Sequence, residues 1–534
     1  MVLLWFVLAA SFELEAANRQ AVFNVRDYGA TGRKADNAQI AIQKAIDACA
    51  GSGGGTVFLP AGQYTSGQLR LRSHVRLYID SGATLFASPD GRAFDKDKAA
   101  LLYGEDLENI TIEGRGTIDG EAQYEWRLDT LDDANIRENM LLMKALGKPL
   151  MRPFPRNFPK ETVYPRMVLL LRCKDVRIAG LSFLRSPSWT INPYACERVV
   201  IDGIYIYSSL KEAVWADGID PDSCKDVRIA NSTIETGDDA IVFYSYNIWG
   251  PALPCENITV TNCRLSSASS ALKFCDCNYK GIRKVTVDNT VITSSNRGIA
   301  FMVFDGGDVS DVVLSNLTVE CKRSDWFWWG DGDPIHFNIK RRSEVDGIAR
   351  KNEPPPGAIR NVQIRNVIAR GKGSSIINGH PESWLENVSL ENVKLRLSHD
   401  PESPLEKATD AIRVRWATNI KLKGVDVSWD HPESAKWESA LRVEDVTGLE
   451  VENFSGRQGM AAGEGPSVVF NRVADATIRY SKAVPDTSVF LRVGGDNSRD
   501  IYLLDNDFLN ARSAYRLEPG VATDRVRVVN SISR

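Results

Sequence analysis

A short alternation of hydrophobic and polar positions recurs from Glu108 almost to the last residue of the chain. Each copy holds a polar pair, a hydrophobic residue, any residue, a second hydrophobic residue, any residue, and then Asn or Gly. Alternation with a period of two is typical of a β-strand, and Asn or Gly in the seventh place suits a left-handed backbone conformation. The copies are ENITIEG at Glu108, KDVRIAG at Lys174, ERVVIDG at Glu197, KDVRIAN at Lys225, ENITVTN at Glu256, RKVTVDN at Arg283, SDVVLSN at Ser310, RNVQIRN at Arg360, ENVSLEN at Glu386, TNIKLKG at Thr418, TGLEVEN at Thr447 and DRVRVVN at Asp524.

Most copies begin 23 to 32 residues after the preceding one. A single strand with open edges is not stable alone, so units at this spacing must stack and share hydrogen bonds. The pattern therefore predicts an all-β solenoid, a parallel β-helix, in which one copy belongs to each coil. A leucine-rich horseshoe is the competing solenoid, and it is disfavoured because the LxxLxLxxN spacing is absent and β-branched residues dominate.

The chain before the repeat predicts a cap on the N-terminal end of this stack, over about residues 22–60. A helical pattern at Ala38–Cys49 is followed by a glycine-rich run at Gly51–Gly55 that ends it. An amphipathic helix at this place covers the open end of a stacked core. The apolar face of the helix is predicted to comprise Ile40, Ile42, Ala45, Ile46 and Cys49.

The repeat also predicts ladders of like side chains along the stack. Cysteines directly precede the polar pair in four copies, so their backbones should lie about 4.8 Å apart in neighbouring coils. Packed thiols are favoured there, a disulfide between neighbours stays open, and a metal site is disfavoured. The cysteines are Cys173, Cys196, Cys224 and Cys255, and an asparagine ladder is expected from Asn231, Asn262, Asn289 and Asn316.

The shared register predicts which later side chains lie beside one another. Positions 13 and 14 residues after the start of each copy form two neighbouring columns, Asp238, Ser269 and Asn296, and Asp239, Ser270 and Arg297. The large apolar residues that follow should face the core, namely Ile241, Phe243, Leu272, Phe274, Ile299 and Phe301. Residues between them then face outward, Val242, Lys273 and Ala300 in one column and Tyr244, Cys275 and Met302 in the next. Lys273 should therefore lie on the outer face beside the acids, as a ligand for an anionic group or as a solvated surface side chain.

The stretch Trp215–Phe243 includes the acidic residues Asp217, Asp220, Asp222, Asp238 and Asp239, and three of these are candidate catalytic groups. Asp217 precedes the pair Asp238-Asp239 by about one coil, which places the three carboxylates on neighbouring strands. An inverting glycosidase needs carboxyl groups about 6.5–9.5 Å apart, so that a water molecule fits between them. Crowded carboxylates raise one another's pKa, so one can stay protonated as a general acid while the others stay charged. A calcium-binding cluster is the rival use of three such acids.

Four stretches of the sequence carry a resemblance to a known family. They are DYGATG to GGGTVFLPAGQY near the N-terminus, SPSWTINP at Ser186–Pro193, DGIDPDSC at Asp217–Cys224 and TGDDAIVF at Thr236–Phe243. Over roughly Phe23–Thr318 the chain resembles glycoside hydrolase family 28, the polygalacturonases and their relatives. The resemblance implies a right-handed parallel β-helix that hydrolyses glycosidic bonds with inversion and without a metal or other cofactor, in an acidic poly- or oligosaccharide such as pectin. It assigns Asp238 as the general acid and Asp217 with Asp239 as the pair that activates water.

Three positions depart from the pattern of this family. Trp215-Ala216 stands where Asn-Thr is usual, Ser269 lies about where a Gly-His-Gly turn has its His, and Ala300-Phe301-Met302 aligns with the Arg-Ile-Lys that grips the galacturonate carboxylate. The cutting residues are thus present, whereas the residues that identify the substrate are exchanged. Either Lys273 and Arg297 rebuild a cation site for an anionic sugar, or the substrate is neutral or sulfated.

Two long segments interrupt the repeat and are predicted to shape a cleft, at about residues 121–166 and 322–357. The second is aromatic and basic, and loops of this length tend to be functional. Trp328 and Trp329 are candidates for stacking on sugar rings, with His336 as a polar contact, and an aromatic plug on the coil is the alternative. Walls at both ends of a groove favour exo action over cutting in the middle of a chain.

Composition narrows the class of partner. Lys and Arg number 65 against 69 Asp and Glu, so a polyanion such as nucleic acid is not the expected partner. Hydrophobic residues make up 43% of the chain, which is ample for one buried core, and residues 18–534 are expected to form a single monomeric domain that binds a carbohydrate.

The first residues predict export. Val2–Phe12 is an apolar run of signal-peptide length, too short to span a membrane, and small residues follow it. A signal peptide over residues 1–17 predicts a secreted or periplasmic protein. The basic residues that usually precede such a run are missing, so a frayed or mis-started N-terminus is the alternative.

Three functions stay open at this point. The first is an exo-acting glycoside hydrolase, and the second is a polysaccharide lyase in which the acids hold calcium and Lys273 or Arg297 removes a proton. The third is a β-helix that binds glycans without cleaving them.

Overall fold

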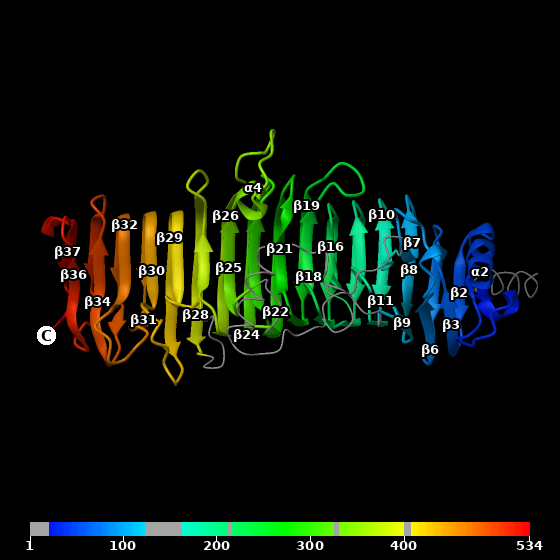
Figure 1. Ribbon diagram of the computed structural model, residues 1–534, viewed down its shortest axis with the longest axis horizontal. Helices are drawn as coiled ribbons and strands as arrows, with labels where there is room; N and C mark the ends of the chain where they lie inside the picture. Colours follow the sequence, from blue (N-terminus) through cyan, green and yellow to red (C-terminus); the bar gives the residue numbers. More distant parts are fainter. Residues whose placement is uncertain are drawn as a thin grey trace, which may run out of the picture.

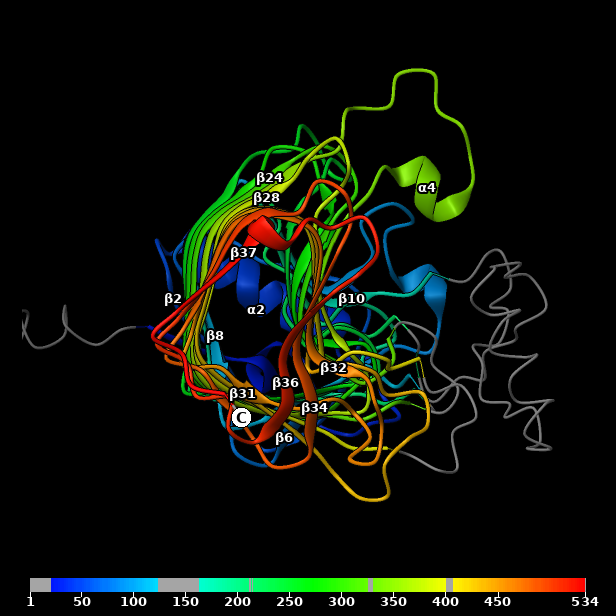
Figure 2. The same ribbon diagram turned by 90° about the vertical axis from the view of Figure 1, so that its left-hand side faces the viewer.

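The chain forms one long stack of parallel β-strands wound into a β-helix, as the repeat predicts (Figure 1). The computed structural model describes residues 21–122, 163–210, 213, 215–324, 330–399 and 407–533. Viewed along the stack, strands from distant parts of the sequence follow the same path (Figure 2). Three columns of strands therefore run the length of the molecule.

The first column contains the strands formed by the seven-residue pattern. Its shorter members are β1 (Val22–Asn24), β2 (Gly55–Leu59), β5 (Val75–Ile79), β8 (Glu108–Gly114), β11 (Lys174–Ala179), β14 (Glu197–Asp202), β16 (Lys225–Ala230), β19 (Cys255–Thr261), β35 (Arg499–Leu504) and β37 (Val526–Val529). Four longer strands continue into the second column, β22 (Ile282–Ser295), β24 (Asp308–Cys321), β26 (Ala358–Gly371) and β28 (Leu385–Leu397).

The second column lies directly after the first in each coil. Its separate strands are β3 (Gly62–Ser66), β6 (Ala83–Ala87), β9 (Thr117–Asp119), β12 (Ser182–Leu184), β15 (Tyr205–Tyr207), β17 (Thr233–Thr236), β20 (Arg264–Ser267), β31 (Ser455–Gly456) and β33 (Lys482–Ala483). Three long strands near the C-terminal end pass through more than one column, β29 (Ile412–Trp429), β30 (Leu441–Glu452) and β32 (Pro466–Arg479).

The third column carries the predicted catalytic residues. Its strands are β4 (Leu69–Arg70), β7 (Ala100–Glu105), β10 (Arg166–Leu171), β13 (Ile191–Tyr194), β18 (Ile241–Ser245), β21 (Ser270–Asn278), β23 (Arg297–Val303), β25 (Asp333–Ile339), β27 (Ser375–Asn378), β34 (Thr487–Gly494) and β36 (Ala511–Leu517). Between β13 and β18 the coil is completed by isolated bridges that join Ile219 to Ile191 and to Ile241.

The predicted register is confirmed. First residues of successive copies pair directly, as Lys174 does with Glu197 and Glu197 with Lys225. In the third column Leu272 pairs with both Ile241 and Ile299, and their side chains face the core. Phenylalanine rings from four successive coils stack inside it, with centroid separations of 5.3, 4.2 and 4.2 Å along Phe243, Phe274, Phe301 and Phe337.

The seventh residue of the copies is left-handed, as predicted, with φ of 54° at both Asn231 and Asn262. Asn262 donates to Asn231 at 3.2 Å and Asn289 donates to Asn262 at 2.7 Å, which confirms this part of the asparagine ladder. The prediction that Asn316 continues this ladder from Asn289 is wrong, because the Asn316 amide donates to the Asp288 carboxylate at 2.7 Å instead. A further regularity was not foreseen: the second residue of the polar pair is left-handed in most copies too, as at Asn257 and Asn361.

The four predicted cysteines lie one above another, fully buried, as free thiols. The Cys173 backbone N–H lies 3.3 Å from the Cys196 sulfur, so the ladder is a packing feature of the core. Burial raises the pKa of Cys224, which keeps its thiol protonated and unreactive.

The N-terminal cap is confirmed as helix α2 (Gln39–Gly51), with Ile42, Ala45, Ile46 and Cys49 fully buried. The placement of Ile40 on the apolar face is wrong, since its side chain is 71% exposed one residue after the helix begins. The other helices are short: η1 (Val25–Tyr28), η2 (Gly91–Ala93), α4 (Arg342–Asp346) and η3 (Thr523–Arg525).

The two predicted insertions are described only in part. Most of residues 121–166, Trp328 and Trp329, and the predicted signal peptide at 1–17 lie outside the described residues. The segment at 322–357 includes the regular strand β25, so His336 belongs to the coil stack, and the part around α4 projects from it (Figures 1 and 2). Among the helices of the described chain, none has the length and apolar character needed to cross a membrane.

Candidate active site

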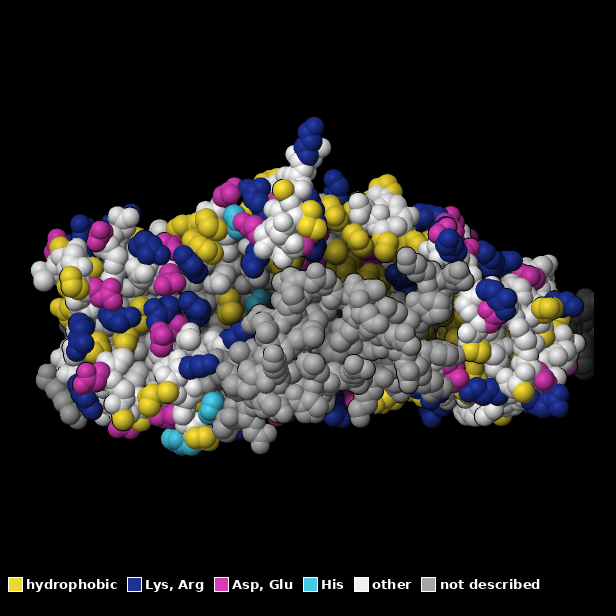
Figure 3. Space-filling view, viewed as in Figure 1, with side chains coloured by type: hydrophobic (Ala, Val, Ile, Leu, Met, Phe, Trp, Pro, Cys, Tyr) yellow, Lys and Arg dark blue, Asp and Glu magenta, His cyan; other side chains and the backbone are white. Residues whose placement is uncertain are grey.

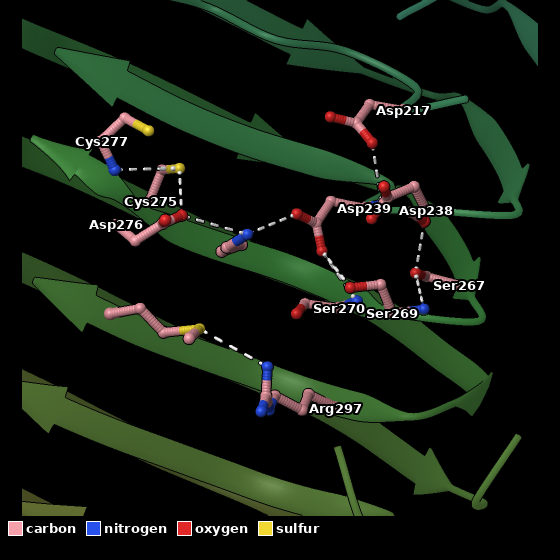
Figure 4. Close-up of polar contacts among 12 residues, drawn as sticks. Asp217, Asp238, Asp239, Ser267, Ser269, Ser270, Cys275, Asp276, Cys277 and Arg297 are labelled. Atoms are coloured by element: carbon pink, nitrogen blue, oxygen red, sulfur yellow. Dashed lines mark hydrogen bonds and ion pairs between the residues drawn. The ribbon is translucent and has the colours of Figure 1, made fainter. Parts of the chain in front are cut away.

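Asp217, Asp238 and Asp239 meet on the outer face of the third column (Figure 4). One carboxylate oxygen of each lies within 4.8 Å of the others, and all three side chains are buried. This distance joins the closest oxygens, so it does not measure the separation of 6.5–9.5 Å between whole carboxyl groups that an inverting glycosidase needs. A Cβ on Gly218 would lie 2.3 Å from the Ala240 carbonyl oxygen, so the glycine lets Asp217 approach Asp239.

Asp239 is held by three donors that suit a charged carboxylate. Its Oδ1 accepts hydrogen bonds from the Ser269 hydroxyl at 2.8 Å and the Ser270 backbone N–H at 2.9 Å. Its Oδ2 accepts from the Lys273 ammonium at 2.8 Å. Ser269 thus lies beside the acids where the register placed it, and its hydroxyl contacts the carboxylate that the resemblance assigns to water activation.

Asp238 has an environment that favours its protonated form. Burial raises its pKa well above the usual range, and the charges of Asp217 and Asp239 raise it further. Its Oδ1 accepts one hydrogen bond, from the Asp239 backbone N–H at 2.9 Å. Neighbouring carboxyl groups whose surroundings differ in this way can divide the roles of acid and base.

Asp220 is a fourth acid in the cluster, present in the DGID motif but given no role from the sequence. It is fully buried, and no hydrogen-bond donor in the described part of the chain serves either of its oxygens. Burial raises the pKa of both Asp217 and Asp220, and the charge of Asp220 raises that of Asp217 further. A raised pKa favours the protonated form, so the buried pair resists carrying two negative charges.

Lys273 is part of a buried chain of ion pairs, so its interpretation as a solvated surface side chain is wrong. Its ammonium lies 2.8 Å from Asp239 Oδ2 and 3.4 Å from Asp276 Oδ1. Burial would lower the pKa of Lys273, but the charges of Asp239 and the other acids raise it well above its usual range. Asp276 continues the chain to Arg342 of α4 at 2.8 Å, and Arg342 also pairs with Asp305.

Arg297 and His336 lie on the C-terminal side of the acids, in the two outward columns that hold Ser270 and Lys273. The Arg297 guanidinium is 3.7 Å from Asp333 Oδ2 and 3.5 Å from the Met302 sulfur. His336 Nδ1 is 3.2 Å from the same Asp333 carboxylate. Burial lowers the pKa of His336, and the nearby Arg297 charge lowers it further.

The structure thus brings together six of the sequence-predicted residues, namely Asp217, Asp238, Asp239, Ser269, Lys273 and Arg297, with His336 one strand beyond Arg297. Sequence reasoning missed Asp276 and Arg342, which connect Lys273 to α4. Arg342 follows the last aromatic residues of a segment without the repeat pattern, so no register could place it. Asp276 lay three residues after Lys273, a spacing that could have suggested the pair.

Among the residues that the structure describes, two groups of side chains have donor atoms close enough to share a cation. They are the three carboxylates Asp217, Asp238 and Asp239, and the run Cys275–Cys277. Lys273 lies against the first group, and Arg342 contacts Asp276 and Cys277 in the second. These side chains already provide positive charge at both places.

Comparison with known families also points to the part of the chain that contains these acids. Residues 156–321 match the model of glycosyl hydrolases family 28, and residues 22–123 match that of rhamnogalacturonase A/epimerase, pectate lyase-like proteins. The first match contains every acid of the cluster. Residues 156–321 are thus similar to glycosyl hydrolases family 28. The chain is accordingly an O-glycosyl hydrolase built on the β-helix of that family.

Individual relatives of this family 28 region are similar over most of their length. A probable polygalacturonase from Vitis vinifera is 25% identical over 65% of this chain and 68% of its own. An endo-polygalacturonase from Pectobacterium carotovorum subsp. carotovorum is 26% identical over 68% of this chain and 85% of its own. The family 28 exopolygalacturonase of Yersinia enterocolitica has the same fold, with a TM-score of 0.62 and 20% identity over 81% of this chain and 79% of that chain.

Proposed function

We propose that this enzyme hydrolyses the glycosidic bonds of a galacturonic acid polymer or oligomer, as in pectin, with inversion at the anomeric carbon. The observation that supports this proposal is the difference between the surroundings of two neighbouring carboxyl groups. Asp239 accepts three hydrogen bonds, one of them from Lys273, whereas burial and neighbouring charges raise the pKa of Asp238. One acid and one base beside each other are what glycoside hydrolysis requires.

In this mechanism Asp238 protonates the leaving oxygen of the scissile bond. Asp217 and Asp239 together bind and deprotonate the attacking water, and Lys273 and Ser269 orient Asp239 through their hydrogen bonds. Tyr244 contributes by holding Asp217, since its hydroxyl lies 3.5 Å from Asp217 Oδ2. Inversion is checked by NMR of the first product: an initial reducing end of the same anomeric configuration as the substrate would contradict it.

A calcium-dependent lyase is the weaker alternative. Lys273 would have to lose its proton to act as the base, but its ion pair with Asp239 favours the charged ammonium. Arg297 is no better suited, because a guanidinium stays protonated in proteins. The third alternative, glycan binding without cleavage, leaves the buried and differently protonated acids without a role.

Exo action is part of the proposal. The segment that carries α4 projects from the coil stack beside the strand that holds Lys273 (Figure 1) and is tied to it by Arg342 and Asp276. Around it, side chains of both charge signs are interspersed over the visible face (Figure 3). Trp328 and Trp329 stay predicted sugar-stacking residues of the same segment. We also propose export from the cytoplasm, since a pectin polymer is an extracellular substrate.

The deciding experiment is a digestion of polygalacturonate and of defined oligogalacturonates, with and without a chelator, by the wild type and by Asp238→Asn. The proposal expects monomer or dimer from the start, the same rate in chelator, no absorbance from unsaturated products, and loss of activity in the variant. Unsaturated products together with dependence on calcium would favour the lyase. A lack of any cleavage across uronic, neutral and sulfated glycans would favour the binding protein.

A further inference from the structure

Arg166 lies on the same outer face as the catalytic acids, on their N-terminal side. It is the first residue of β10, whose Val168 pairs with Ile191 of β13, and Ile191 bridges to Ile219. Counting two residues back from each of these partners places Arg166, Trp189 and Asp217 in one outward row on successive strands. With about 4.8 Å between strands, the backbone of Arg166 is about 10 Å from that of Asp217.

Two tryptophan rings flank the Arg166 guanidinium. Its central carbon lies 4.7 Å from the ring centroid of Trp189 and 5.0 Å from that of Trp249, and both rings are partly exposed. Cation–π contacts of this kind fix the plane of a guanidinium but use none of its N–H donors. The two rings therefore hold the Arg166 side chain in place without using its N–H donors.

Within the described chain the Arg166 side chain has no hydrogen bond or ion pair, and its Nε is buried without an acceptor. The two other cations beside the acids are already engaged, Lys273 with Asp239 at 2.8 Å and Arg297 with Asp333 at 3.7 Å. Asp220 is the acid whose charge acts most strongly on Arg166, but burial raises the pKa of Asp220 and so favours its neutral form. Arg166 is half-buried with its Nε inaccessible, and such a cation is costly without a partner, so this position is suited to an incoming anion.

We propose that Arg166 binds the carboxylate of a uronic acid unit of the substrate, next to the bond that is cleaved. This inference rests on the proposed function and names the group that replaces the missing Arg-Ile-Lys grip. A guanidinium offers two parallel N–H donors that match a carboxylate, and low exposure strengthens such a pair. The flanking rings of Trp189 and Trp249 provide apolar surface for the sugar itself.

The site is coupled to the catalytic acids by an aromatic contact. Trp189 stacks on Tyr244 with ring centroids 5.0 Å apart and an interplanar angle of 21°. The Tyr244 hydroxyl is the group that lies 3.5 Å from Asp217 Oδ2. A sugar carboxylate bound at Arg166 thus reaches a surface that continues directly to the proposed base.

The test compares one oligogalacturonate with its fully methyl-esterified form, which has the same shape but no charge. We expect Arg166→Gln to lower kcat/KM for the free acid about 10- to 100-fold, as for loss of a hydrogen bond to a charged group, and to change that for the ester less than threefold. Arg166→Lys should recover part of the loss. Arg228→Gln removes the same charge from an exposed position on β16 and should leave both substrates unaffected.

The outcomes separate this inference from the proposed function. Suppose that the wild type cleaves the free acid. If Arg166→Gln then lowers kcat/KM equally for the free acid and the ester, or changes kcat/KM for neither of them, the role of Arg166 is overturned and the proposed function stands. If the wild type cleaves neither galacturonide, the proposed function fails and the inference with it. Thermal unfolding of each variant shows whether a loss on both substrates comes from misfolding.

Discussion

The Lys273 ammonium lies 2.8 Å from Asp239 Oδ2, on the strand next to the acid and almost inaccessible to solvent. A buried lysine is stable only when it is paired, and here the partner is a carboxylate proposed to activate water. The same ammonium is 3.4 Å from Asp276, which links it to Arg342. Ion pairs therefore link the proposed base to residues from two other parts of the chain.

Replacing Lys273 with Met should slow catalysis and move the whole pH profile upward. The Lys273 charge lowers the pKa of both Asp217 and Asp238, so without it both carboxyl groups hold their protons to higher pH. The acid limb and the alkaline limb of kcat/KM should then move in the same direction. Lys273→Arg keeps the charge and should shift the limbs less. A Lys273→Met profile with unchanged limbs would show that the ion pair does not control the acids.

Removing the proposed general acid should stabilise the protein. Asp238 has a folded-state pKa raised above its unfolded value, so its contribution to stability is full below the unfolded pKa near 3.9 and is lost as pH rises through the folded pKa. Asn is neutral at every pH and does not suffer this loss. Asp238→Asn should therefore raise Tm more at pH 7 than at pH 4, while activity falls about 10²- to 10⁴-fold. An equal change in Tm at both pH values would contradict the raised pKa.

Arg342 should influence the active site through Asp276, although it does not touch the catalytic acids. Burial opposes ionisation of Asp276, but Lys273 and Arg342 hold its pKa below the usual range. Without Arg342, Asp276 competes more strongly for Lys273, so Asp239 loses part of its neutralising charge. We expect Arg342→Gln to lower kcat with little change in KM and to shift the pH profile upward, less than Lys273→Met does.

The matched control for Arg342 is Arg350→Gln. Arg350 pairs with Asp346 in the same projecting segment and has no contact with Asp276. If both variants lower kcat equally, the effect belongs to the stability of the segment rather than to the chain of ion pairs. Limited proteolysis of the region around α4 measures that stability directly.

Much of the fold could be predicted because the repeat carries its own register. Alternation fixed which side chains face the core, and stacking then placed Ser270 beside Arg297 and Val242 beside Lys273. Backbone pairing does not determine how far a long side chain reaches, however. The pairing of Lys273 with Asp239 depends on this reach, and so does the close approach of the three carboxylates.

Features outside the repeat were harder to predict. Ile40 fits the helical period of the cap, but it lies at the first turn of α2, beyond the strands that the helix covers. Arg166 follows a long segment without the pattern, so its place beside Trp189 became visible only when β10 and β13 paired. The exchanged specificity residues are thus compensated, in our proposal, by side chains that no local motif identifies.

The asparagine ladder should stabilise the coil stack by a measurable amount. Asn262 has φ of 54°, accepts a hydrogen bond from Asn289 at 2.7 Å and donates one to Asn231 at 3.2 Å. Asn262→Ala loses both bonds, at up to ~1 kcal/mol each, and also removes the short polar side chain that lets Asn tolerate left-handed backbone better than Ala does. Asn262→Gly tolerates the left-handed backbone without strain and loses only the two hydrogen bonds. Chemical denaturation should therefore rank the wild type above Asn262→Gly and Asn262→Ala last, and a glycine variant as stable as the wild type would show that the exposed ladder contributes nothing.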